Sequence, residues 1–234
     1  MAEVHVFDSP SALAEAAAAR IVSCAAAVQA RGKRFRIALS GGRTPAAAYR
    51  ILGGGIAPAV DWTRVAVLFA DERDAPPTEP ESNYWEARKL FLEPAGVPPE
   101  RVHRMKAEAP DLAAAAAAYE PLLAEPLDLL VLGIGEDGHT ASLFPGSPLV
   151  RERQRRVAAV FDSPKPPPRR LTITPRVIDE AGEVLMLASG AGKAEAVARA
   201  LVGDGDPAEV PAWLARNGTW CLDAAAAAML RGRA

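Results

Sequence analysis

The feature that most constrains the fold of this 234-residue chain is a repeated alternation of short apolar runs, loops rich in glycine or charge, and helix-forming segments. The run at 65–69 is apolar throughout, as expected of a strand that is buried on both faces of a sheet. Further strands are expected at 35–39, 102–105, 127–132, 157–161, 171–174, 184–188 and 219–222. Helices are expected at 11–31, 45–52, 83–92, 111–123 and 193–201, and a polar loop at 71–81. This order predicts an α/β fold: a single three-layer α/β/α, Rossmann-like domain over 1–234 with a mostly parallel central sheet.

The overall charge restricts the partners of the chain. Hydrophobic residues make up 50% of the sequence, which is enough for a sizeable core, and the net charge is −2. A chain without a basic excess lacks the electrostatic field that nucleic-acid binding requires, so we expect no nucleic-acid partner. An anionic small molecule would need a local basic site. We expect a monomer or a weak homodimer.

The cysteines and the N-terminal segment indicate a reducing compartment. Cys24 and Cys221 lie in different segments without metal-binding spacing, which favours two free thiols over a disulfide. No uninterrupted apolar run reaches the roughly 18 residues that span a bilayer. The first ten residues carry Glu3, His5 and Asp8 and lack a basic region followed by an apolar stretch, so a signal peptide is not expected. We expect a cytoplasmic protein with no membrane partner.

The first strand-end loop has the composition of an anion site. Ser40-Gly41-Gly42-Arg43-Thr44 follows the run at 35–39 and precedes a helix that we expect to begin at Pro45. The glycines let backbone N–H groups approach an anion closely, and the helix N-terminus adds partial positive charge. The loop is neither a Walker A motif nor a G-x-G-x-x-G motif. It is therefore either a phosphate-binding loop or an ordinary tight turn.

Two further loops place charged residues at strand ends. Asp71-Glu72-Arg73 follows an apolar strand, where charges are costly to bury unless they are paired. Arg73 can clamp an oxyanion or a carboxylate there, or the loop is simply solvated. The loop 133–145 has three glycines before its histidine, and Asp137 stands two residues before His139. This combination predicts that His139 is a general base and that Asp137 orients its imidazole.

Basic residues return late in the chain. Lys165 and Arg170 flank a proline-rich stretch that we interpret as a stiff loop over a site, and Lys193 lies at a second glycine-rich helix start. These three cations either meet a phosphate or face solvent. The chain has three histidines and no metal-ligand spacing, so we expect a metal-independent site without a cofactor. No G-x-S-x-G nucleophile elbow occurs.

The run from Gly133 to Pro145, GIGEDGHTASLFP, closely resembles the hallmark of the 6-phosphogluconolactonase family. The family's other blocks are matched in order and extend the resemblance to nearly the whole chain: Ser40-Gly-Gly-Arg-Thr-Pro45, Asp71-Glu-Arg73, Ser82-Asn-Tyr84, Pro168-Arg-Arg-Leu-Thr-Ile-Thr174 and Ser189-Gly-Ala-Gly-Lys193. The resemblance implies hydrolysis of 6-phospho-D-glucono-1,5-lactone to 6-phospho-D-gluconate in the pentose phosphate pathway. It also implies that the partner is this small sugar phosphate lactone.

Two other functions stay open at this point. Glucosamine-6-phosphate deaminases share the implied fold and an Asp-Gly-His loop, but theirs continues with Ile-Ala-Phe-Asn-Glu, whereas this chain continues with Thr-Ala-Ser-Leu-Phe. They also carry Asp-Glu-Tyr where this chain has Asp71-Glu-Arg73. A non-catalytic sugar-phosphate-sensing domain, of the kind attached to bacterial repressors, would not need His139. We therefore favour the hydrolase.

The resemblance and the loop chemistry together predict a mechanism. The phosphate docks between the 40–44 loop, Arg170 and Lys193, and His139 takes a proton from the water that attacks C1. Arg73 stabilises the oxyanion, and Asp137 either orients His139 or is itself the base. The other residues assigned to substrate or phosphate binding are Ser40, Gly41, Gly42, Arg43, Thr44, Asp71, Asn83, Gly135, Ser142 and Lys165.

Overall fold

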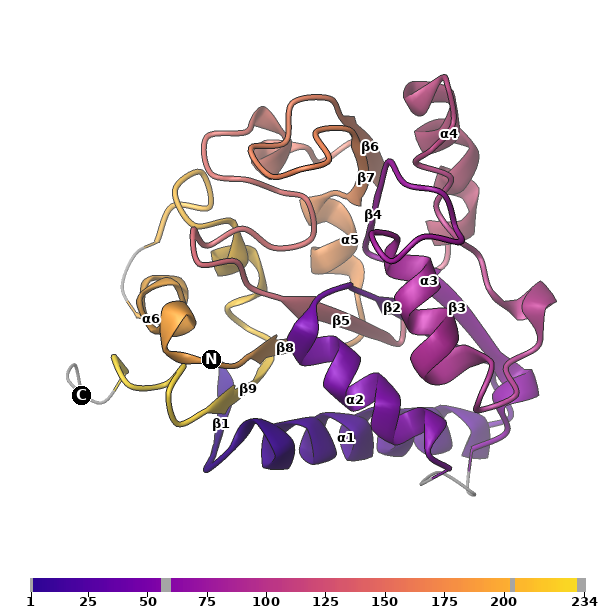
Figure 1. Cartoon of the computed structure of the whole chain (residues 1–234), viewed down its shortest axis with the longest axis horizontal. Coiled ribbons are helices and arrows are strands. Elements are labelled where there is room, and N and C mark those ends of the chain that lie inside the picture. The colour runs from indigo at the N-terminus through magenta and orange to yellow at the C-terminus, as the bar shows by residue number, and fades with distance from the viewer. Residues whose placement is uncertain (1, 56–59, 203–204, 231–234) are drawn as a thin grey trace.

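A six-stranded parallel sheet forms the centre of the computed structural model, which describes residues 2–55, 60–202 and 205–230. The strand order is β1-β9-β8-β5-β2-β3, and every neighbouring pair is parallel (Figure 1). The strands are β1 (Glu3–Phe7), β2 (Phe35–Leu39), β3 (Val65–Phe69), β5 (Leu129–Gly133), β8 (Val184–Ala188) and β9 (Thr219–Asp223). All residues of β3, β8 and β9 are buried, which fits the apolar runs of the sequence.

Helices flank both faces of this sheet, which confirms the predicted three-layer α/β/α class. They are α1 (Pro10–Ala30), α2 (Arg43–Gly53), α3 (Asn83–Ala87), α4 (Leu112–Tyr119), α5 (Pro175–Glu180) and α6 (Ala194–Leu201). In Figure 1, α1 and α2 lie below the sheet and α5 lies above it. Short 3-10 turns occupy Trp62–Arg64, Pro99–Arg101, Glu120–Leu123, Pro148–Arg151, Ala191–Lys193 and Pro211–Ala215, and Arg88–Leu92 is a π turn.

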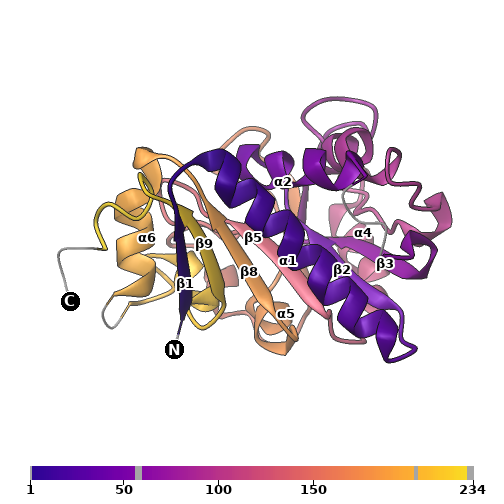
Figure 2. The same ribbon diagram turned by 90° about the horizontal axis from the view of Figure 1, so that it is seen from below.

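Helix α1 runs diagonally across one face of the sheet (Figure 2). Ser9 caps its first turn by accepting a hydrogen bond from the Ala12 N–H, and Pro10 occupies the first helical position. By length and composition α1 is also apolar enough to cross a membrane. Leu13, Ile21 and Val28 are, however, buried against the sheet, as in the core helix of a globular protein.

A second, antiparallel sheet lies above the large one in Figure 1 and was not predicted. It has the order β4-β7-β6 and consists of β4 (Asp71–Arg73), β7 (Arg170–Ile173) and β6 (Val157–Val160). The sequence suggested that 71–81 is a loop throughout. Its first three residues are a strand because β7 supplies the hydrogen-bond partners, about 100 residues further along the chain. Three charged residues give no alternation from which this strand could have been recognised.

Other boundaries also differ from the sequence-based expectations. The expected strand at 102–105 is wrong, because only Val102 forms an isolated bridge, to Val67. Strand β1 was missed; its ladder with β9 joins residues 3–7 to residues 219–223, and Glu3, Val4, His5 and Val6 are exposed at the sheet edge.

Two expected helices change their winding before they end. The helix expected at 83–92 widens into a π turn after Ala87, and the helix expected at 111–123 tightens into a 3-10 turn after Tyr119. Pro121 accounts for the second change, because it has no N–H to continue the α-helical ladder.

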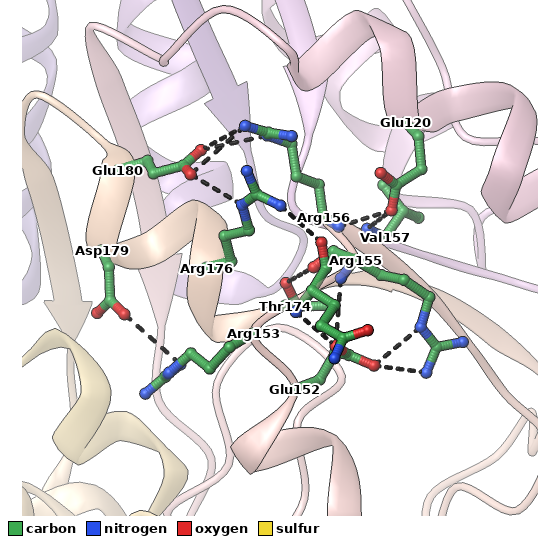
Figure 3. Close-up of polar contacts among 11 residues, drawn as sticks. Glu120, Glu152, Arg153, Arg155, Arg156, Val157, Thr174, Arg176, Asp179 and Glu180 are labelled. Atoms are coloured by element: carbon green, nitrogen blue, oxygen red, sulfur yellow. Dashed lines mark hydrogen bonds and ion pairs between the residues drawn. The ribbon is translucent and has the colours of Figure 1, made fainter.

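A polar network holds the small sheet to α4 and α5 (Figure 3). One carboxylate oxygen of Glu120 accepts hydrogen bonds from the backbone N–H groups of Arg156, at 2.6 Å, and Val157, at 2.8 Å. The Arg156 guanidinium contacts Glu180 on α5 at 3.1 Å, and Arg176 contacts the same carboxylate at 2.8 Å. The network therefore fixes the start of β6, and with it the sheet that carries Arg170.

We predict that Glu120→Ala lowers the free energy of unfolding by about 1–3 kcal/mol, because it leaves the N–H groups of Arg156 and Val157 without their acceptor. Glu120→Gln keeps an acceptor oxygen, so we expect it to lose less than half as much unfolding free energy as Glu120→Ala. Urea denaturation of the three proteins measures the difference. Equal stability of the alanine variant and the wild type would contradict this role.

The two cysteines are free, as predicted. Burial raises the pKa of the Cys24 thiol to about 12, and Glu183 adds to the shift, accepting a hydrogen bond from the thiol at 3.3 Å. Burial also raises the pKa of Cys221 to about 11. Both groups therefore stay in the unreactive thiol form at neutral pH.

A thiol reagent tests these pKa values. Since the thiolate fraction grows tenfold per pH unit below the pKa, we predict very slow labelling of both cysteines by Ellman's reagent at pH 8 and acceleration towards pH 10. Unfolding in guanidinium chloride at pH 8 restores the rate of an ordinary thiol. Rapid labelling of the folded protein at pH 7 would contradict the raised values.

Candidate active site

The candidate site is a cavity of about 500 Å³ at the carboxyl edge of the parallel sheet. Its lining comes mainly from the loops after β2, β5 and β8, and β2 and β5 are the neighbouring strands at which the strand order changes direction. Ligands of open α/β sheets bind at such a point. The predicted site residues that line the cavity are Ser40, Gly41, Gly42, Arg43, Thr44, Asp71, Arg73, Asn83, Gly135, His139, Lys165, Arg170 and Lys193. Asp137 and Ser142 do not line it but bind residues that do.

His139 and Asp137 form a tight pair in the loop after β5. The distance from His139 Nδ1 to Asp137 Oδ1 is 2.5 Å, and the His139 ring packs on Phe144 with a centroid distance of 4.8 Å. Burial raises the pKa of the Asp137 carboxyl, but the hydrogen bond and charge of His139 and the charge of Lys165 outweigh it, so the net pKa lies below its usual range. Nδ1 is thus engaged with a carboxylate, and Nε2 is the ring nitrogen available for chemistry.

Glycine is required beside this pair. A Cβ on Gly135 would lie 2.0 Å from His139 Nδ1 and 2.3 Å from Asp137 Oδ1. The Gly135 N–H donates to the His139 carbonyl at 2.8 Å, which closes the loop on itself. The glycine of this motif therefore makes room for the imidazole and the carboxylate.

Asp71 joins loops from different parts of the chain. Its side chain is 6% exposed, and it accepts hydrogen bonds from Ser142 Oγ, at 2.7 Å, and from Asn83 Nδ2, at 3.0 Å. The other side of the Asn83 amide lies against Gly41, where a Cβ would come within 1.9 Å of Oδ1. Asp71 thus connects the loop that carries His139 with the loop after β2. Its role here is to position Asn83 and Ser142.

Glu72 supports the site and was not singled out by the sequence analysis. Its carboxylate is 2% exposed and accepts hydrogen bonds from Ser82 Oγ and from the N–H groups of Arg73, Asn83 and Tyr84, at 2.8 to 3.0 Å. It therefore closes the first turn of α3 and places Asn83. The buried position of a charged residue after an apolar strand was the signal that could have revealed it.

The loop after β2 leads into α2, which begins at Arg43 rather than at Pro45. Gly42 is the N-cap residue with a φ of 108°, a conformation that favours glycine, and no side chain caps the helix. The N-terminus of α2 therefore presents uncapped backbone N–H groups beside the cavity. The Ser40 hydroxyl donates to the Val131 carbonyl at 2.9 Å, which fixes the loop to β5.

The loop after β8 brings Lys193 to the cavity. Asp223, at the end of β9, accepts hydrogen bonds from Ser189 Oγ at 2.6 Å and from the Gly190 N–H at 3.0 Å. Asp223 was also missed by the sequence analysis, because its partners lie in the loop after another strand, β8. Burial lowers the pKa of the Lys193 ammonium, and the charge of Glu136 partly compensates.

Arg170 and Arg73 differ in how many of their donor groups are hydrogen-bonded. Arg170 is 5% exposed; its Nε and Nη2 donate to the carbonyls of Pro167, Lys165 and Pro166 at 3.0 to 3.1 Å. Arg73 Nη1 donates to the Glu81 carbonyl at 3.2 Å, and its Nε has no hydrogen-bond partner among the described residues. Arg73 lines the cavity, whereas most of the Arg170 guanidinium is used to hold the 163–168 segment. Within the described part of the chain, no group of three His, Cys, Asp or Glu side chains is placed to hold a metal ion.

The fold and the site thus define an α/β protein with a cation-lined cavity and a His–Asp pair at the carboxyl edge of its sheet. Residues 8–222 match the model of the family described as glucosamine-6-phosphate isomerases/6-phosphogluconolactonase. The chain belongs to this family. It is 43% identical to the 6-phosphogluconolactonase of Mycobacterium tuberculosis over an alignment covering 97% of this chain and 98% of that protein.

Solved structures agree with this assignment. The 6-phosphogluconolactonase of Trypanosoma brucei superimposes with a TM-score of 0.87 at 29% identity, and the match covers 98% of this chain and 99% of that one. A monomeric glucosamine-6-phosphate deaminase superimposes with a TM-score of 0.83 at 23% identity, over 97% of this chain and 99% of that one. The second likeness shows the fold alone, so the choice between the two activities depends on the residues of the site.

The Gly135 contact yields a prediction. Because an added Cβ would collide with both members of the pair, Gly135→Ala is expected to lower the free energy of unfolding by about 1–3 kcal/mol and to displace His139. Gly133→Ala is the matched control, since a Cβ there meets only the Leu187 carbonyl oxygen, at 3.9 Å. Urea denaturation of both variants measures the effect. Similar stability of the two variants would show that the loop accommodates the methyl group.

Proposed function

We propose that the protein hydrolyses 6-phosphogluconolactone to 6-phosphogluconate in the pentose phosphate pathway, with His139 as the general base. The observation that carries the proposal is the His139–Asp137 pair, 2.5 Å apart, at the wall of a cavity lined by Arg43, Arg73 and Lys193. Membership of the family and the 43% identity to a mycobacterial 6-phosphogluconolactonase support the choice of substrate.

The phosphate is bound at the wall formed by the α2 N-terminus. Uncapped N–H groups there, the Arg43 side chain and Lys193 provide the positive charge that a dianion requires. Anchoring the phosphate at this wall orients the lactone ring towards His139, so binding energy from a non-reacting group positions C1. Thr44 and the glycines of the loop line the same wall.

The reaction then proceeds by water attack on C1. His139 Nε2 takes a proton from the water as its oxygen bonds to the carbonyl carbon, and Asp137 stabilises the resulting imidazolium. Arg73, which lines the cavity, stabilises the oxyanion of the tetrahedral intermediate. Collapse of this intermediate breaks the bond between C1 and the ring oxygen, and the imidazolium returns its proton to that oxygen. The product carries a carboxylic acid, which ionises.

His139 is a better candidate for the base than Asp137. Asp137 does not line the cavity, and its Oδ1 already accepts from His139 Nδ1. Its pKa lies below the usual range, because the hydrogen bond and the neighbouring charges outweigh burial, so it is a weak base at neutral pH. We therefore assign it the orienting role.

The proposal extends to the setting of the enzyme. Residues 1–234 act as one domain, which is supported by a core that runs continuously from α1 to β9. The bacterial relatives of this chain favour action in the cytoplasm on a free sugar phosphate. The absence of a basic excess favours action without a nucleic-acid or membrane partner. We propose that the protein acts as a monomer or a weak homodimer and needs neither metal nor cofactor.

The assay follows freshly generated 6-phosphogluconolactone, corrected for spontaneous hydrolysis, with a chelator present. We predict that His139→Ala lowers kcat at least about 100-fold, because general base catalysis contributes 10²–10⁴ to rates. The matched variant Asp137→Asn keeps the imidazole, and we expect its kcat to fall less than that of His139→Ala. Circular dichroism confirms that both variants fold.

Each alternative has its own outcome in this assay. An Asp137 variant that is slower than the His139 variant would move the base to Asp137. Failure of the wild type to accelerate lactone loss would refute the hydrolase. Ammonia release from glucosamine 6-phosphate would then establish the deaminase, which lacks support in the Thr140–Phe144 residues that follow His139.

A further inference from the structure

Lys165 occupies an unexpected place in the cavity. Its ammonium lies 3.3 Å from Asp137 Oδ1 and 3.4 Å from His139 Nδ1, although it comes from the 163–168 segment, 26 residues from His139. The sequence assigned it to substrate or phosphate binding. Its contacts are instead with the proposed base and its carboxylate.

The backbone of Lys165 is held on several sides. Its N–H donates to Ser163 Oγ at 3.2 Å, and its carbonyl accepts from Ser163 Oγ at 2.8 Å and from Arg170 Nη2 at 3.0 Å. Arg170 also binds the carbonyls of Pro166 and Pro167. These hydrogen bonds and the prolines at 166–168 restrict the segment, and the Lys165 ammonium lies against the His139–Asp137 pair.

Arg170 supports both sides of this arrangement. Its guanidinium lies 5.6 Å from the centroid of the Phe144 ring, and that ring packs on His139. Its Nη1 approaches Ser142 Oγ at 3.5 Å, in the loop that carries His139. One buried side chain therefore sets the position of Lys165 relative to the imidazole.

We propose that Lys165, set in place by Arg170, tunes the His139–Asp137 pair as a positioning residue instead of binding the phosphate. This inference rests on the proposed role of His139 as the base. Both Lys165 Nζ and His139 Nδ1–H are donors to the same oxygen, Asp137 Oδ1, so the ammonium competes for the carboxylate that would stabilise an imidazolium. The cation also lies 3.4 Å from His139 Nδ1, so the contact opposes formation of the imidazolium.

Other charges act on the pair from further away. Glu136 lies on the same loop, Lys193 interacts with Asp137 from the turn after β8, and Arg170 is separated from the imidazole by Phe144. Among these groups Lys165 has the direct contacts. For two unit charges about 3.4 Å apart in a water-like medium, the repulsion corresponds to a shift of roughly one pH unit. The Lys165 side chain is 43% exposed, which justifies the water-like value.

The first experiment measures the titration midpoint of His139 in the substrate-free protein by NMR. His139→Gln identifies its signal among the three histidines. We expect Lys165→Met, which keeps the aliphatic stem, to raise the midpoint by about one pH unit, because removal of the cation favours the imidazolium. Lys165→Arg keeps the charge and stays near the wild-type value. Lys193→Met is the matched control and shifts the midpoint less than half as much.

The second experiment separates tuning from phosphate binding. We expect the acid limb of kcat/KM to move to higher pH in Lys165→Met by the same amount as the NMR midpoint. The Kd of 6-phosphogluconate, measured by calorimetry at pH 8, changes less than threefold, whereas Lys193→Met weakens it at least tenfold. Arg170→Lys moves the midpoint in the same direction as Lys165→Met, and the double variant equals Lys165→Met, because Arg170 acts through Lys165.

Three outcomes would overturn the inference. An unchanged midpoint in Lys165→Met refutes tuning, whatever happens to product affinity. A shifted midpoint together with a tenfold loss of affinity refutes the separation of tuning from phosphate binding. An additive double variant refutes the part assigned to Arg170. Failure of the wild type to hydrolyse the lactone would refute the proposed function instead, and the NMR titration would still report on the Lys165 contact.

Discussion

The buried carboxylate of Asp71 is the interaction on which the candidate site depends. A carboxylate without donors is costly to bury, by roughly 1–3 kcal/mol for a lost partner and more when it is charged. Asp71 meets this requirement with Ser142 and Asn83, which lie 71 and 12 residues away in the sequence. Satisfying one charge therefore aligns the His139 loop with the loop after β2. The proposed base and the proposed phosphate wall are thereby connected through one carboxylate.

The two sheets contribute different parts of the site. The large parallel sheet brings the ends of β2, β5 and β8 to one edge, and their loops supply His139 and Lys193. The small antiparallel sheet lies above the large one (Figure 1); its strand β7 carries Arg170, and the loop between β6 and β7 carries Lys165. Strand β4 belongs to the small sheet but directly follows β3 of the large one. Arg73 and Asp71 on β4 therefore face the cavity from the junction of the two sheets.

The charge distribution around the cavity differs from that of the whole chain. The net charge is −2, yet the cavity is lined by Arg43, Arg73, Lys165, Arg170 and Lys193. Asp71, the acidic residue of the lining, is engaged by its own hydrogen-bond donors. A locally positive cavity attracts a sugar phosphate without giving the surface a general affinity for polyanions.

Much of the site could be predicted from the sequence because its chemistry is local. His139 and Asp137 are two residues apart, and glycines mark the loops after β2 and β5, so strand-end position and residue type were sufficient. Strand β4, Glu72 and Asp223 were missed, because each is defined by partners on other segments. Lys165 was recognised as a site cation but not as a neighbour of His139. The sequence by itself determined the alternating elements, the glycine loops and the neighbouring positions of His139 and Asp137. Only the tertiary structure decided which loops meet, because strand order and the second sheet depend on hydrogen-bond ladders between distant segments, which no local pattern encodes.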